Sequence, residues 1–161
     1  MKKSVEVKLP VRIGPGQRPL TEILTADELE DNHYRLVFSP GLVESLAAGD
    51  EFAINAAEPS GFKVTRRGGN FCIWFFFPKQ GMNYSAEAQR LVHEVASIGG
   101  RMDGGGETTL VFTVPAASGF DRIADFFDDA VLRIADSAWS FSNAYEPTSG
   151  APLDWWQTWA T

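Results

Sequence analysis

The uncharged stretch "FCIWFFF", residues 71–77, places the strongest constraint on the fold of this chain. It is far too short to cross a bilayer, and it has the length of a buried strand. Successive side chains of a strand point to opposite faces. Both faces of this strand are apolar, so both must be covered. We expect two helices to cover one face and the N-terminal sheet or the C-terminal tail to cover the other. One face carries Phe71, Ile73, Phe75 and Phe77, and the other carries Cys72, Trp74 and Phe76.

The residues before this strand, "RRGGN" at 66–70, raise two alternatives. Backbone amides of a glycine turn can bind a phosphate. However, no helix is expected directly after the turn, as a phosphate-binding loop would require. The glycines also suit the positive φ angles of a tight turn. The pattern therefore favours a hairpin turn that joins the preceding strand to residues 71–77.

The N-terminal region, residues 1–68, reads as five short strands separated by turn residues such as "GPGQRP" and "AEPSG". Little helix is expected there, apart from a short helical turn over residues 41–49 that ends at Gly49. Asp50 follows it and is expected to bond to local backbone amides. This pattern predicts a small, bent sheet or barrel-like part.

From Phe71 onward the order is strand, helix, strand, strand, helix, strand. Ser85 and Ser118 are expected to cap the two helices, and Gly99 is expected to end the first. This order is typical of the ferredoxin-like βαββαβ unit, in which the first and third strands are central. The corresponding segments, "FCIWFFF" and "TTLVFTV", are the two most apolar in the chain.

The predicted fold class is therefore α+β, with a small N-terminal β part packed on a C-terminal ferredoxin-like unit. The boundaries are 1–68 for the β-rich part, 69–146 for the ferredoxin-like part and 147–161 for a Trp-rich tail. We expect the tail to fold back on the protein, because exposed Trp is costly for a soluble monomer. The alternative is an arm that binds a partner.

Several short motifs occur in an order that resembles a bacterial family of uncharacterised proteins, domain of unknown function 4265. They span roughly residues 5–145 and read "TEILTA", "YRLVFSP", "AGDEF", "RRGGN", "SIGGRMDGGG" and "FTVP". The chain departs from the family pattern at Thr25, where the family often has Trp, and in its Trp-rich tail. The resemblance implies the two-part architecture and supplies no catalytic residue.

The charge of the chain is unevenly distributed. The formal net charge is -7, and residues 81–161 account for all of it, with four Arg and eleven Asp or Glu. Such a surface repels nucleic acid and attracts a basic protein. In the second helix, a set of aspartates recurs at near-helical spacing, which suggests that they share one face. This face would bind such a partner. The alternative is a face that is merely solvated. The set comprises Asp121, Asp125, Asp128, Asp129 and Asp136.

Candidate catalytic residues are sparse. Cys72 is the single cysteine, which excludes an intramolecular disulfide, and its apolar surroundings indicate a packing role. His33 and His93 are the two histidines, and no motif unites them in a catalytic or metal site. We therefore assign no catalytic, cofactor-binding or metal-binding residue.

Two functional hypotheses follow. The first is a non-enzymatic protein-binding module, such as a cytoplasmic immunity protein that neutralises a basic toxin domain. The cytoplasmic location is expected because no apolar run follows the basic N-terminus, and neither hypothesis involves a membrane. The alternative is an enzyme or small-ligand-binding protein with a cleft between the two parts. It requires His33, His93, Glu22, Asp50 and Arg67 to converge. Homodimer formation is compatible with either hypothesis.

Overall fold

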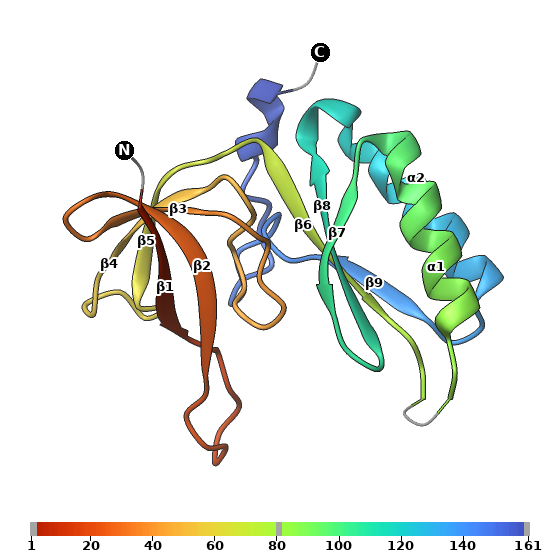
Figure 1. Cartoon of the computed structure of the whole chain (residues 1–161), viewed down its shortest axis with the longest axis horizontal. Helices are drawn as coiled ribbons and strands as arrows, with labels where there is room; N and C mark the ends of the chain where they lie inside the picture. Colours follow the sequence, from red (N-terminus) through yellow and green to blue (C-terminus); the bar gives the residue numbers. More distant parts are fainter. Residues whose placement is uncertain (1–2, 80–81, 160–161) are drawn as a thin grey trace.

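The computed structural model describes residues 3–79 and 82–159 and shows an α+β protein with two antiparallel sheets (Figure 1). The N-terminal sheet is a meander in which each strand pairs with the next along the chain, in the order β1-β2-β3-β4-β5. Within the described residues β1 does not pair with β5, so the sheet is curved but forms no closed barrel. Its strands are β1 (Lys3–Pro10), β2 (Thr21–Glu30), β3 (His33–Leu36), β4 (Glu51–Ile54) and β5 (Phe62–Arg66).

The C-terminal sheet has the strand order β7-β8-β6-β9. The two apolar strands, β6 and β8, are therefore central, as predicted. Both α-helices lie on one face of this sheet (Figure 1). The elements are β6 (Asn70–Phe76), α1 (Ser85–Glu94), β7 (Arg101–Gly105), β8 (Thr109–Pro115), α2 (Phe120–Arg133) and β9 (Ala138–Phe141).

Strand β6 is covered fully on one face and only in part on the other, where Phe76 remains 38% exposed. One face packs beneath the helices, where Phe71, Phe75 and the α2 residue Phe127 are fully buried. The other face is covered by the long loop between β3 and β4, residues 37–50, and not by strands of the N-terminal sheet. In that loop the Pro40 carbonyl accepts a hydrogen bond of 2.8 Å from the Trp74 indole. The β3–β4 loop thereby joins the two parts of the protein.

Two local predictions at the junction of the two parts are wrong. Residues 68–70 form no hairpin, because β5 and β6 belong to different sheets. The two glycines instead allow close approach, since Gly68 packs directly against the backbone of Gly49. Residues 41–49 form no helical turn. The Glu22 carboxylate binds three successive amides at the start of this segment.

The observed helix ends agree only in part with those predicted from the sequence. Gly99 adopts a left-handed conformation (φ 75°) at the end of a short 3-10 helix (Val95–Ile98) that follows α1, which confirms its predicted role as the stop. Ser85 and Ser118 do not cap the helices. Ser85 donates its amide to Asn83, whereas the Ser118 hydroxyl donates to the Ile98 carbonyl. Ser85 is itself the first residue of α1, and both serines bond to groups outside α1 and α2.

The C-terminal tail folds back on the protein, as predicted. Its Trp-rich segment forms a 3-10 helix (Trp155–Trp159) that packs on the buried cluster around Phe71. Trp156 is buried, and the Trp155 indole donates a hydrogen bond to the Asn143 carbonyl. The tail therefore covers the Phe71 end of the core and leaves the other face of β6 to the β3–β4 loop.

Candidate functional site

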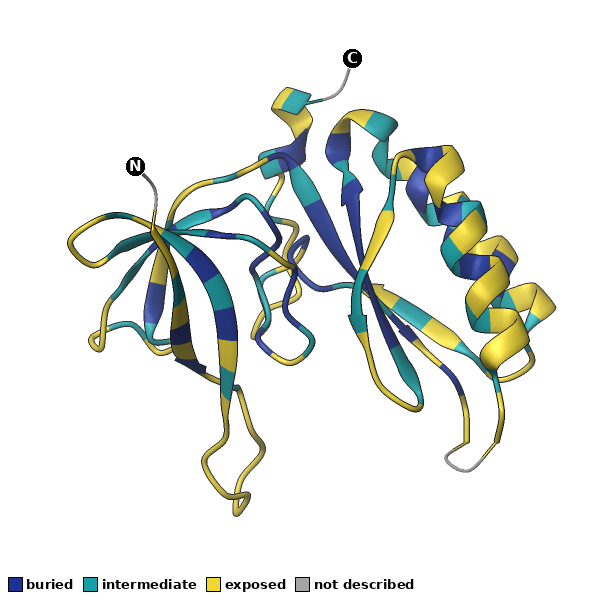
Figure 2. Ribbon diagram, in the orientation of Figure 1, coloured by how far each residue is buried: buried dark blue, intermediate teal, exposed yellow. Residues whose placement is uncertain are grey.

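Helix α2 places four of the five predicted aspartates on its exposed side. Ile123, Phe127 and Ala130 anchor the opposite side in the core. Figure 2 shows the outward side of both helices as largely exposed. Along α2 the spacing of 3.6 residues per turn brings the aspartates together on one surface. The exposed residues of this acidic face are Asp121, Asp125, Asp128 and Asp129.

Asp136 does not belong to this face, so that part of the prediction is wrong. Helix α2 ends at Arg133, and Ile134 already has extended backbone angles. Asp136 then lies in a turn with a left-handed conformation (φ 60°). The near-helical spacing of the aspartates continues past the residue at which the helix stops.

The basic side chains of α2 do not neutralise the acidic face. Arg122 donates to the Ser97 carbonyl at 2.8 Å, and Arg133 forms an ion pair of 3.0 Å with Glu94. Both therefore lie toward α1. Hydrogen bonding from Arg90, assisted by Arg133, lowers the pKa of Glu94. On the side toward β9, the Trp139 indole donates to Asp128 at 2.9 Å.

An exposed leucine completes the acidic face. Leu132 follows Asp128 by four residues, which places the two side chains one turn apart. It is 83% exposed, the most exposed large hydrophobic residue within the described chain. Leu132 was not predicted as part of this face, although its position on the polar side of α2 follows from the same helical spacing.

The residues named for the enzyme hypothesis do not form one site. The buried Asp50 forms an ion pair of 3.0 Å with the partly buried Arg67. His33 lies on β3 in the N-terminal sheet, whereas His93 is exposed on α1. Within residues 3–79 and 82–159, no hydrogen bond or ion pair joins either histidine to Asp50, Arg67 or Glu22. The convergence that this hypothesis requires is absent from the described part of the chain.

Asp50 and Glu22 instead accept hydrogen bonds from backbone amides. The Asp50 carboxylate accepts hydrogen bonds from the amides of Ala47 and Gly68, as predicted for a carboxylate at this turn. Burial raises the pKa of Asp50, whereas the Arg67 guanidinium and the two amides oppose this rise. Glu22 binds the amides of residues 41–43 at 2.8 to 2.9 Å. Both carboxylates hold the β3–β4 loop in place.

Cys72 is a packing residue, as its sequence context indicated. Its side chain is fully buried, and burial raises the pKa of the thiol to about 12. A thiol in this state is a poor nucleophile. Within the described residues, no group of three His, Cys, Asp or Glu side chains is placed to hold a metal ion.

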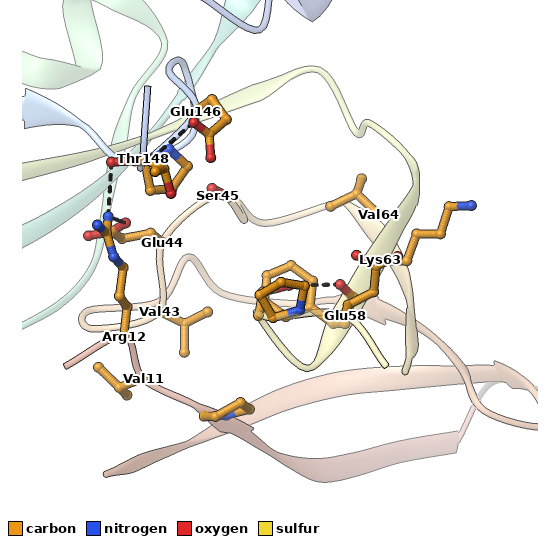
Figure 3. Close-up of a pocket in the computed structure, with 15 residues that line it drawn as sticks. Val11, Arg12, Val43, Glu44, Ser45, Glu58, Lys63, Val64, Glu146 and Thr148 are labelled. Carbon is orange, nitrogen blue, oxygen red and sulfur yellow. Dashed lines mark hydrogen bonds and ion pairs between the residues drawn. The ribbon is translucent and has the colours of Figure 1, made fainter. Parts of the chain in front are cut away.

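A pocket of about 600 Å³ lies between the N-terminal part and the segment 146–148 (Figure 3). At its edge the Arg12 guanidinium donates to the Pro147 carbonyl at 2.9 Å and lies 3.7 Å from Glu44. None of the five residues named for the enzyme hypothesis lines this pocket. The residues that line this pocket were not predicted from the sequence, because they come from segments far apart in the chain.

Comparison with known proteins defines the family. The model of the domain of unknown function DUF4265 matches residues 22–138. The chain belongs to the DUF4265 family. This confirms the resemblance that the ordered motifs suggested. Among curated proteins, no match was found for this DUF4265 member.

One solved structure shows the same fold. It is described as a "Novel crystal structure of a hypothetical protein from Neisseria gonorrhoeae". It covers 88% of the DUF4265 chain and 94% of its own chain, with a TM-score of 0.61 and 17% identity. At this identity the similarity concerns the fold alone. In the described part of the DUF4265 protein, no helix has both the length and the apolar character needed to span a membrane.

Proposed function

We propose that this DUF4265 protein is a non-enzymatic binding module that recognises a basic protein through the acidic face of α2. The observation that carries this proposal is the combination of four exposed aspartates with the exposed Leu132 on one helix. An immunity protein that neutralises a basic toxin domain in the cytoplasm would use such a face. The acidic residues would occupy the basic cleft in which the toxin binds its substrate.

The physical basis of recognition has two components. Complementary charge speeds encounter and selects a basic partner, but charge alone contributes modest affinity at physiological salt. Burial of Leu132 supplies the apolar contact that such an interface needs at its centre. Because Arg122 and Arg133 are engaged toward α1, Asp121, Asp125 and Asp129 are available to a partner, whereas Asp128 also accepts a hydrogen bond from Trp139.

We also propose that the C-terminal part is ferredoxin-like and that the N-terminal part is a bent, barrel-like sheet. The strand order β7-β8-β6-β9 supports the ferredoxin-like assignment. This arrangement turns the outer side of α2 away from the sheet. Homodimer formation is compatible with this function, and light scattering of the purified protein would detect it.

The test is co-purification from the native host with two charge-reversal variants. Asp125→Lys combined with Asp129→Lys reverses two charges on the acidic face. Glu28→Lys combined with Glu30→Lys makes the same charge change on exposed positions of β2. We expect a basic partner whose affinity falls at least tenfold with the α2 variant and stays unchanged with the β2 variant. Absence of a basic partner, or equal retention by both variants, refutes the proposal.

A second candidate function is small-ligand binding in the pocket between the two parts. The pocket volume of about 600 Å³ is within the range of known small-molecule sites. Its position at the junction of two sub-structures is also typical of ligand sites. This function does not need the histidines, and it uses a surface separate from α2.

A further inference from the structure

The walls of the pocket are largely apolar. Phe62 and Val43, which line it, are buried side chains of the N-terminal core. Three prolines add to this apolar lining, and one of them belongs to the C-terminal segment 146–148. Such walls suit the hydrocarbon body of a ligand. The apolar lining residues are Pro10, Val11, Val43, Phe62, Val64, Pro59 and Pro147.

The charged groups around the pocket are mostly negative. Three glutamates line it, Glu44, Glu58 and Glu146, together with Arg12 and Lys63. Arg12 is already engaged, because it bonds to Pro147 across the edge and pairs with Glu44. Figure 3 shows the Lys63 side chain extending away from the pocket. With three glutamates against one arginine and one lysine, the pocket lining carries a net charge of -1.

Glu146 keeps its negative charge over the physiological pH range. Hydrogen bonds from Ser149 and Thr148 lower the pKa of its carboxyl to about 2. The same bonds fix the carboxylate at the turn that closes the C-terminal side of the pocket. A ligand thus meets an apolar wall and a fixed negative charge.

We propose that this pocket binds a small organic cation with an apolar body, of the alkylammonium class. The hydrocarbon part would lie against Phe62, Val64 and Val11, and the ammonium group would lie at the carboxylate of Glu58. This inference rests on the second candidate function, and it adds the chemical class of the ligand. It is independent of protein binding by α2.

The experiment compares three linear probes of eight carbons each that carry different head groups: n-octylamine, n-octanol and n-octanoate. Each is titrated into the isotopically labelled full-length protein at pH 7, and amide shifts are followed by NMR. We expect n-octylamine to shift residues 43–45, 58–64 and 146–148. It should bind at least about tenfold more tightly than n-octanoate, because the two head groups carry opposite charges.

A pair of isosteric variants tests the role of the carboxylates. Glu58→Gln removes one charge from the pocket, and we expect it to weaken n-octylamine binding severalfold without changing n-octanol binding. Glu30→Gln is the matched control at the far end of β2, and it should change neither. Unchanged amine binding in Glu58→Gln overturns the assigned position of the ammonium group.

The probes also distinguish an error in the ligand class from an error in the choice of the pocket as a ligand site. If n-octanoate or n-octanol binds the same residues as tightly as n-octylamine, the pocket is a ligand site but the cationic class is wrong. If no probe shifts these residues at millimolar concentration, the second candidate function fails as well. Binding that causes shifts only on α2 likewise refutes the pocket as the site.

Discussion

Gly68→Ala tests the contact that joins the two parts of the protein. A Cβ atom at position 68 would lie 2.3 Å from the carbonyl carbon of Gly49 and 2.4 Å from its oxygen. Ordinary van der Waals contact begins at 3.4 Å, so the two backbones must separate by about 1.1 Å. The clash involves backbone on both sides, so no side-chain rotation relieves it.

The cost has two components. Overpacking of this kind destabilises by about 1–3 kcal/mol. Separation also stretches the 2.8 Å hydrogen bond from the Gly68 amide to the buried Asp50 carboxylate, and a bond to a charged group contributes about 1.5–3 kcal/mol. The lower entropy of the unfolded alanine variant offsets about 0.4–1 kcal/mol. We therefore expect a loss of about 2–5 kcal/mol in the free energy of unfolding.

Urea unfolding followed by tryptophan fluorescence measures this loss as a lower midpoint. Gly106→Ala is the matched control, because a Cβ there meets nothing within 4 Å. We expect it to change stability by less than about 0.5 kcal/mol. If Gly68→Ala stays within that range of the control, the close approach of Gly68 and Gly49 does not exist in solution and the reasoning is refuted.

Three further outcomes are expected. Glu22→Ala leaves the amides of residues 41–43 without their acceptor, so stability falls by about 2 kcal/mol and these amides exchange hydrogen faster; unchanged exchange contradicts the assigned role. Trp156→Ala costs about 3–5 kcal/mol in urea unfolding, whereas Leu132→Ala at an exposed position costs less than about 0.5 kcal/mol; equal losses contradict the packing of the tail. Burial raises the pKa of the Cys72 thiol to about 12, above its ordinary 9.0, so the folded state loses stability as pH rises through this interval. At pH 8 Ellman's reagent should react with it only in denaturant, and rapid labelling of the native protein contradicts this.

The element order was predictable because each element carries a strong local signal. The element order and the high apolar content of β6 and β8 identified the two central strands, and Gly99 marked a helix stop that the structure confirms. The turn at Gly68 was predicted wrongly for a reason outside its local sequence. A glycine turn gives a hairpin only if the flanking strands pair, and here the first strand pairs within the N-terminal sheet.

The candidate sites were predictable to different degrees. Helical spacing alone was enough to place Asp121 and Asp125 on the acidic face, and it would also have identified Leu132. Asp136 was placed wrongly because no glycine marks the end of α2. The pocket could not be predicted from the sequence, because its lining combines segments near residues 11, 44, 60 and 147 that only the fold brings together.

The ion pair between Asp50 and Arg67 connects three segments at the junction of the two parts. They are the β3–β4 loop, the connection between β5 and β6, and the C-terminal tail. Asp50 binds the amide of Gly68 in the connection to β6, and Arg67 donates to the Ser45 carbonyl of the β3–β4 loop. The Arg67 guanidinium also lies 5.6 Å from the centre of the Trp155 ring, which brings the tail into the same cluster. Ser45 lines the pocket, so this cluster and the Arg12 contact to Pro147 together fix the two walls relative to each other. The pocket is thus preformed, whereas α2 presents its acidic face from the outer side of the other sheet. The two proposed functions use separate surfaces, so each can be abolished by mutation without loss of the other.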